Sequence, residues 1–181
     1  PALCNRIDRG TCGMVIAAKN AEALRVLNEK IRLREIDKYY LCVTAGHLSP
    51  KEGRLSGYLL KDGENNRVRA VGSRVEGART AVTEYRVLKS MPDRDLVEAR
   101  LITGRTHQIR VHMATLGHPL LGDAVYGPAR AAGFRREAGA AGRLCRRQML
   151  HAWRLSFPHP HSGETLSFQQ PPPPDFWRMP L

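Results

Sequence analysis

The first half of the chain alternates short apolar runs with one amphipathic stretch. Residues 14–18 form a short apolar run, which predicts a strand. Asn20 stands before apolar residues that recur at helical spacing from Ala21 to Ile31. This pattern predicts a helix that is capped by Asn20 and ends near Arg34. Residues 38–44 are rich in aromatic and β-branched side chains and predict a second strand.

The second half adds more strands and one more helix. Residues 62–66 are polar and predict a turn between strands at residues 55–60 and 67–71. Residues 107–116 predict a helix, because Gly117 supplies a left-handed stop and Pro119 prevents its resumption. Further strands are predicted at residues 81–88, 96–102, 150–157 and 164–168, and an ordered loop at residues 122–127. Many strands with few helices indicate an α+β fold, with a large mixed, mostly antiparallel sheet flanked by helices and loops.

The size of the chain predicts one domain over residues 1–181. A chain of 181 residues with 42% hydrophobic residues is long enough to bury a core. No apolar run approaches the roughly 18–20 residues of a membrane span, and no export signal is present. Because the chain begins at Pro1 rather than Met, we expect a fragment of a longer protein. We expect it to be a monomer.

The charge of the chain is strongly positive. It has 29 Lys and Arg against 17 Asp and Glu, a formal net charge of +12. Such a surplus favours a polyanionic partner through counterion release, although it is also compatible with a merely basic protein. Residues 129–147 hold six Arg and one Glu. We therefore expect this stretch to contact an anionic substrate, because the planar guanidinium suits phosphate.

The cysteines and histidines do not predict a metal site. The four cysteines contain no C-x-x-C pair, and His107 and His112 miss the spacing of a helical zinc motif. Without an export signal, we expect reduced thiols and a cytoplasmic protein.

One carboxylate stands between two arginines near the start of the chain. Asp8 is flanked by Arg6 and Arg9, just before a predicted strand. Nearby positive charges favour the ionised carboxylate, which can act as a nucleophile or base but not as a proton donor. The same spacing is also typical of a surface aspartate in an ion pair.

A second polar segment leads into the predicted helix at residues 107–116. Gly104 forms a turn, and the free N–H groups at the helix start lie beside Arg105. Such a helix start binds anions, here either a phosphate or the catalytic carboxylate itself. The alternative is a capped helix with solvated charges.

Together these two segments resemble the signatures of RluA-type RNA pseudouridine synthases. Residues 5–13 (NRIDRGTCG) resemble the family pattern H-R-L-D-R-x-T-S-G, and residues 104–112 match G-R-T-H-Q-I-R-V-H. Further agreement lies at residues 38–40, 117–119, 122–127, 150–152 and 158–164. The resemblance extends from about residue 3 to residue 177.

The resemblance implies isomerisation of uridine to pseudouridine in ribosomal or transfer RNA, with Asp8 as nucleophile. It also implies that Tyr40 packs against the flipped base, that Arg105 pairs with Asp8, and that Arg6 enters the RNA stack where the uridine leaves. The implied catalytic residues are Asp8, Tyr40 and Arg105. The implied RNA-binding residues are Arg6, Arg9, Thr106, His107, Gln108, Ile109 and Arg110. The reaction is an internal rearrangement, so the resemblance implies no metal and no cofactor.

The chain also departs from the family pattern. Asn5 replaces the usual His, although Asn keeps a hydrogen-bonding side chain, and Cys12 replaces Ser. The family domain normally has strands before its aspartate motif and often a separate RNA-binding domain, and we expect this chain to lack both. The competing hypotheses are an inactive RNA-binding or RNA-chaperone protein of the same fold, and a glycosidase. A glycosidase requires two carboxylates around the bond, whereas this motif offers one.

Overall fold

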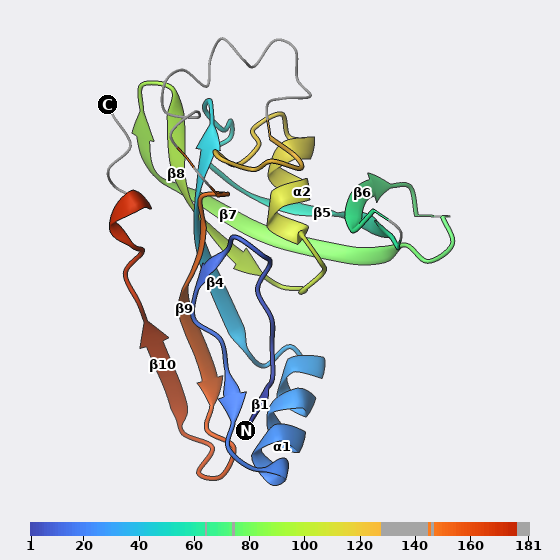
Figure 1. Ribbon diagram of the computed structural model, residues 1–181, viewed down its shortest axis with the longest axis vertical. Coiled ribbons are helices and arrows are strands. Elements are labelled where there is room, and N and C mark those ends of the chain that lie inside the picture. The colour runs from blue at the N-terminus through green and yellow to red at the C-terminus, as the bar shows by residue number, and fades with distance from the viewer. Residues whose placement is uncertain (64, 74, 128–144, 146, 177–181) are drawn as a thin grey trace.

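The computed structural model describes residues 1–63, 65–73, 75–127, 145 and 147–176. Its centre is an eight-stranded sheet in the order β10-β9-β4-β8-β7-β5-β6, with β2 paired to β9 (Figure 1). The β2–β9 pair is parallel, and the other pairs are antiparallel. The sheet strands are β2 (Cys12–Gly13), β4 (Asp37–Ala45), β5 (Glu52–Asp62), β6 (Arg67–Val71), β7 (Arg79–Met91), β8 (Arg94–Leu101), β9 (Leu150–Pro158) and β10 (Thr165–Gln169). The predicted α+β fold with a mixed, mostly antiparallel sheet is confirmed.

The remaining elements lie around this sheet. Strands β1 (Ala2–Leu3) and β3 (Ala17–Ala18) form a separate two-stranded sheet. The helices are α1 (Ala21–Arg32), α2 (Gln108–Thr115) and a short 3₁₀ turn, η2 (Pro174–Phe176). Along the parts of the chain that the structure describes, no helix is long and apolar enough to cross a membrane.

Both predicted helices are confirmed within two residues at each end. The side chain of Asn20 accepts a hydrogen bond from the Ala23 N–H, as a capping residue does. Gly117 follows α2 with a φ of 83°, which is the left-handed conformation that ends a helix.

The strand predicted at residues 14–18 is much shorter than expected. Only Ala17 and Ala18 belong to a strand, β3. The run is divided between two sheets, because the Met14 N–H donates to the carbonyl of Ala152 and continues the β2–β9 pairing of the main sheet, whereas β3 pairs with β1. An apolar run predicts burial, but it does not predict with which strand its backbone will pair.

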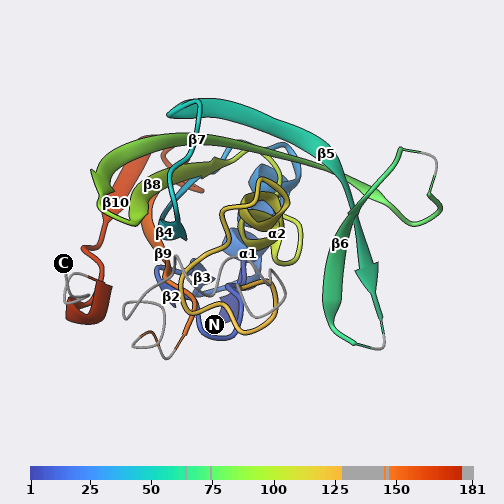
Figure 2. The ribbon, with the colours of Figure 1, turned by 90° about the horizontal axis from the view of Figure 1, so that it is seen from above.

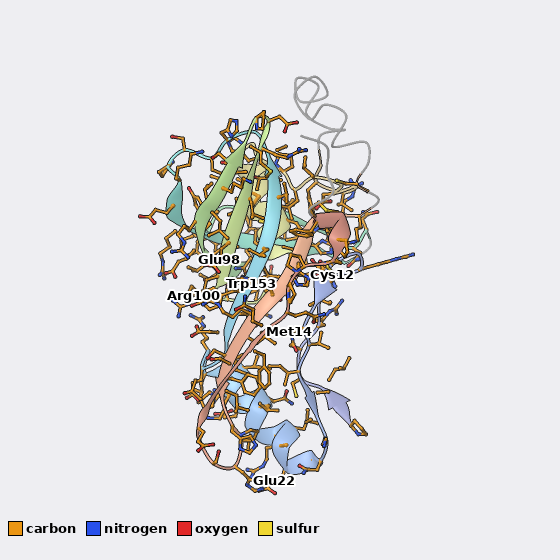
Figure 3. The ribbon with its side chains drawn as sticks, turned by 90° about the vertical axis from the view of Figure 1, so that its left-hand side faces the viewer. Cys12, Met14, Glu22, Glu98, Arg100 and Trp153 are labelled. Atoms are coloured by element: carbon orange, nitrogen blue, oxygen red, sulfur yellow. The ribbon has the colours of Figure 1, made fainter. Side chains whose placement is uncertain are left out.

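The two faces of the sheet differ. Helix α2 lies beneath the curved sheet (Figure 2), where Ile109 and Met113 pack against Tyr40, Val97 and other residues of one core cluster. On the opposite face, Glu98, Arg100 and Trp153 lie over β8 and β9 (Figure 3). Ion pairs cover part of this second face. They join Arg100 to Asp37 and Glu84, and Glu98 to Arg86 and Arg154.

Candidate active site

A cleft of about 470 Å³ opens on the α2 side of the sheet. Four parts of the chain form it: the segment before β2, the end of α1, the start of β4 and the loop that leads into α2. Of the residues predicted for the site, seven line the cleft: Arg6, Asp8, Tyr40, Arg105, Thr106, Gln108 and Ile109. Arg9, His107 and Arg110 lie outside this lining.

A tight turn presents Asp8 to the cleft. The Thr11 N–H donates to the carbonyl of Asp8 at 2.9 Å, and Gly10 between them has a φ of 85°. The buried side chain of Gln148 donates to the carbonyl of Arg9 at 2.7 Å and so ties the turn to the segment before β9. A left-handed glycine and one buried amide therefore fix the position of the carboxylate.

The two residues that depart from the family pattern have partners of their own. Asn5 Oδ1 accepts a hydrogen bond from the Ile16 N–H at 2.7 Å, which ties the segment before Asp8 to the residue that precedes β3. This agrees with the expectation that Asn5 keeps a hydrogen-bonding side chain. The Cys12 Sγ lies 3.1 Å from Nδ1 of the buried His151.

Arg110 is the cation that contacts Asp8. Its Nη1 lies 3.7 Å from Asp8 Oδ2, while its Nε and Nη2 donate to the two oxygens of Asp123 at 2.7 and 2.9 Å. The side chains of Arg110 and Asp123 are 5% and 1% exposed, and that of Asp8 is 18% exposed. Asp123 thus holds Arg110 in a bidentate pair and leaves one nitrogen for the carboxylate at the cleft.

The shared guanidinium also affects ionisation. Burial opposes the charged form of Asp123, but the hydrogen bonds and charge of Arg110, together with backbone N–H donors, outweigh it and lower the pKa of Asp123. Burial likewise acts against the charge of Arg110, and its two carboxylate partners raise its pKa. Both groups are therefore charged at neutral pH.

The expectation that Arg105 pairs with Asp8 is wrong. Arg105 Nε donates to the carbonyl of Thr80 at 2.9 Å, and the structure shows no ion pair between Arg105 and Asp8. The reason is where the helix begins. The Arg105 N–H is bound by the side chain of Gln108, so residues 104–107 form the turn and Arg110 falls in the first turn of α2.

Gln108 joins this turn to the sheet. Its Oε1 accepts from the Thr103 hydroxyl and the Arg105 N–H. Its amide nitrogen donates to the Val82 carbonyl and to the Thr83 hydroxyl at 2.9 and 2.8 Å. Gln108 is 2% exposed, so it acts as a buried support for the site rather than as an exposed RNA ligand.

Tyr40 forms an apolar wall of the cleft. It is 6% exposed and packs in the same cluster as Ile109 and Ile7. Burial, and then the charge of Asp8, raise the pKa of Tyr40 to about 12. The ring is therefore an apolar surface with a protonated hydroxyl at the edge of the Asp8 site.

His107 supports Arg110 through Tyr126. The Tyr126 hydroxyl accepts from the Val68 N–H and shares a hydrogen bond with His107 Nδ1, each at 2.8 Å. The guanidinium of Arg110 lies 5.0 Å from the centre of the Tyr126 ring. Burial lowers the pKa of His107, so its imidazole is neutral and can accept this hydrogen bond.

Asp123 and Tyr126 are the supporting residues that the sequence did not single out. The available signal was the match to the family pattern at residues 122–127, which predicted an ordered loop but gave these two side chains no role. The basic stretch at residues 129–147 lies outside the described residues, except for 145 and 147. In the described part of the chain, no group of three His, Cys, Asp or Glu side chains could hold a metal ion.

Comparison with known proteins identifies the family. The family model described as RNA pseudouridylate synthase matches residues 1–115. Ribosomal large subunit pseudouridine synthase D of Neisseria meningitidis serogroup A is 38% identical over 177 residues, which cover 98% of this chain and 46% of that protein. Its counterpart in Nitrosomonas europaea is 39% identical over 96% of this chain and 48% of that protein. The chain therefore spans about half the length of these curated relatives.

Solved structures agree with the sequence comparison. The structure titled Human RNA Pseudouridylate Synthase Domain Containing 4 has a TM-score of 0.79 and 28% identity, over 97% of this chain and 73% of that chain. The structure titled Human RNA Pseudouridylate Synthase Domain Containing 1 has a TM-score of 0.76 and 28% identity, over 95% of this chain and 69% of that chain. As the RluA-type motifs predicted, this chain belongs to the RNA pseudouridylate synthase family.

Proposed function

We propose that this chain is a catalytic domain that converts uridine to pseudouridine in RNA, with Asp8 as the reacting carboxylate. The observation that carries the proposal is the Asp8–Arg110 pair at the wall of a cleft lined by Tyr40 and Ile109. The cleft volume of about 470 Å³ falls within the roughly 300–1,000 Å³ of small-ligand sites, and a nucleotide is a ligand of that class.

The chemistry requires an ionised carboxylate. The reaction breaks the bond from N1 of uracil to C1′ of the ribose, turns the base and joins C5 to C1′; C5 loses its proton to water, and N1 takes up a proton. Asp8 can attack C1′, add to C6 of the base or assist loss of a sugar proton. Each of these routes starts from a carboxylate, and the guanidinium of Arg110 lies 3.7 Å from that of Asp8.

The cleft also suits a uridine that has left its stack. An enzyme that acts on a base must extract it from its stacked neighbours, at a cost of a few kcal/mol. Tyr40 and Ile109 offer apolar surface for the uracil faces. Arg6 is exposed at the same cleft and can fill the vacancy by stacking on bases and contacting phosphate.

Ribosomal RNA of the large subunit is the proposed substrate, because the two bacterial relatives named above carry that substrate in their names. The test uses a large-subunit ribosomal RNA transcript labelled with tritium at C5 of uridine. Pseudouridine formation releases this tritium to water, and sequencing then maps the modified position. A labelled pool of transfer RNA serves as the second substrate.

Asp8→Asn is the decisive variant, and Glu22→Gln at an exposed position of α1 is the matched control. We expect Asp8→Asn to abolish tritium release while RNA binding persists, and Glu22→Gln to behave as the wild type. Unchanged turnover by Asp8→Asn would refute the role of the carboxylate. RNA binding by the wild type without any pseudouridine would identify an inactive RNA-binding protein, and free uracil among the products would identify a glycosidase.

A further inference from the structure

Unpaired positive charge gathers at one end of the cleft. Arg34, Lys38 and Arg105 line it, and they come from the bend after α1, the start of β4 and the loop before α2. Among the described residues that line the cleft, Asp8 is the only carboxylate, and its ion-pair partner is Arg110. This end of the cleft therefore has cations without a protein anion to balance them.

Lys38 is the most constrained of the three. It is two residues from Tyr40 on β4, so both side chains lie on the cleft face of the strand. Its ammonium lies 3.5 Å from the position that a Cβ on Gly104 would take. The side chain is partly buried, the structure gives it no hydrogen bond or ion pair, and burial lowers its pKa.

Arg105 is held in place but not neutralised. One nitrogen, Nε, donates to the carbonyl of Thr80, which aims the rest of the guanidinium without supplying a charge. Burial, and then the like charges of Arg79 and Arg34, lower the pKa of Arg105. Arg34 and Arg105 both line the cleft, and two like charges that repel one another are stabilised when an anion binds between them.

Arg34 lies at a sharp bend of the backbone after α1. Its φ of 63° is a left-handed conformation, which costs free energy for a residue with a side chain. The bend is supported by a hydrogen bond from the Glu35 N–H to the carbonyl of Lys30. The exposed guanidinium is thereby directed from the end of α1 to the rim of the cleft.

We propose that Arg34, Lys38 and Arg105 bind backbone phosphates of the RNA strand that carries the target uridine. The ligand is a phosphodiester because the three cations come from separate elements, and because guanidinium and ammonium donors both suit phosphate oxygens. The choice of RNA as the source of these phosphates rests on the proposed function. Arg105 then acts in substrate binding, at a distance from the Asp8–Arg110 pair.

The experiment measures RNA affinity and turnover in the same variants. The probe is the large-subunit ribosomal RNA transcript, and the variants are Lys38→Met, Arg105→Gln and the combination of both with Arg34→Gln. Lys89→Met, which removes an exposed charge on β7, is the matched control. The dissociation constant is measured at several salt concentrations, and the tritium release rate is measured over a range of RNA concentrations.

We expect each single variant to raise the dissociation constant about tenfold, since a lost charge-assisted hydrogen bond has roughly that effect. The slope of log affinity against log salt should fall by roughly 0.7–0.9 for each lost phosphate contact. The loss should appear in KM more than in kcat. Lys38→Arg should restore most of the affinity, and Lys89→Met should bind as the wild type.

The outcomes separate this inference from the proposed function. If the triple variant binds RNA with unchanged affinity and salt slope, or loses kcat but not affinity, the phosphate site is refuted. If the wild type makes no pseudouridine but the affinities and slopes change as expected, the phosphate site stands and the proposed function fails. Thermal melting of each variant shows that a loss of affinity does not come from unfolding.

Discussion

The contact between Arg110 and Asp8 gives the sharpest test of the site. Arg110→Met keeps the length and packing of the side chain but removes its charge, so Asp8 and Asp123 both lose their partner. Arg110→Lys keeps the charge but has one nitrogen where the native residue uses three. It can reach one carboxylate well, and Asp123 is the nearer of the two.

The size of the effect follows from the geometry. Opposite charges 3.7 Å apart attract by about 4 kcal/mol at the effective dielectric of about 20 that suits partly buried pairs. If the whole attraction supports the reactive carboxylate, its loss slows the reaction by roughly 10³-fold. Water reaches Asp8, whose side chain is 18% exposed, so this value is the upper limit.

Single-turnover tritium release at saturating RNA measures this step directly. We expect Arg110→Met to approach the upper limit and Arg110→Lys to fall between it and the wild type. Arg105→Lys, which keeps a cation outside the Asp8 pair, should change the rate far less than either. If Arg110→Met turns over within about threefold of the wild type while its RNA affinity is normal, the pair does not support the reacting group.

Three further predictions concern stability. Asp123→Asn should lower the free energy of unfolding by about 3 kcal/mol at neutral pH, because it removes the bidentate counter-charge of a buried guanidinium and leaves only Asp8, at 3.7 Å. Denaturant unfolding measures this difference, which should shrink as the pH falls through the low pKa of Asp123. Gly13→Ala should lower the melting temperature and the rate together, because its Cβ would lie 2.2 Å from the Ala152 carbonyl oxygen at a φ of 108°, and a normal melting curve would contradict this reading. A hydrogen bond to Asp95 raises the pKa of His47 above 6.5, so the stability from this pair is present below that pH and is lost as the pH rises through the folded pKa. The wild type should therefore melt at a higher temperature than His47→Gln, and this difference should be larger at about pH 6 than at about pH 9. Equal differences at the two pH values would refute the contribution of the His47–Asp95 pair.

The elements of this fold were predictable where the information is local. The capping side chain of Asn20 and the left-handed Gly117 act within a few residues of themselves, so the sequence indicates both helix ends. Apart from β2, the strands of the main sheet were likewise predictable from apolar and β-branched runs. The pairing of Met14 with Ala152 was not, because it depends on a partner far along the chain.

The partner of Asp8 could not be predicted for a similar reason. Arg105 and Arg110 lie in the same short segment, and either could face the carboxylate. The choice depends on the buried hydrogen bonds of Gln108, which set where α2 begins, and on Asp123, which arrives from the loop after the helix. Neither contact leaves a pattern that can be read from the spacing of residues.

The resulting division of charge suggests how the site orients its substrate. In the buried cluster beside Asp8, the guanidinium of Arg110 serves two carboxylates and His107 is neutral, so this cluster has no surplus positive charge to attract a phosphate. Lys38 and Arg105 also line the cleft, and no protein anion balances their charges. The electrostatic part of nucleotide binding is therefore most favourable when the phosphate lies beside Lys38 and Arg105 and the uncharged base lies beside Asp8. In the proposed function, the charges that we propose bind the RNA strand would thus direct the uracil toward Asp8.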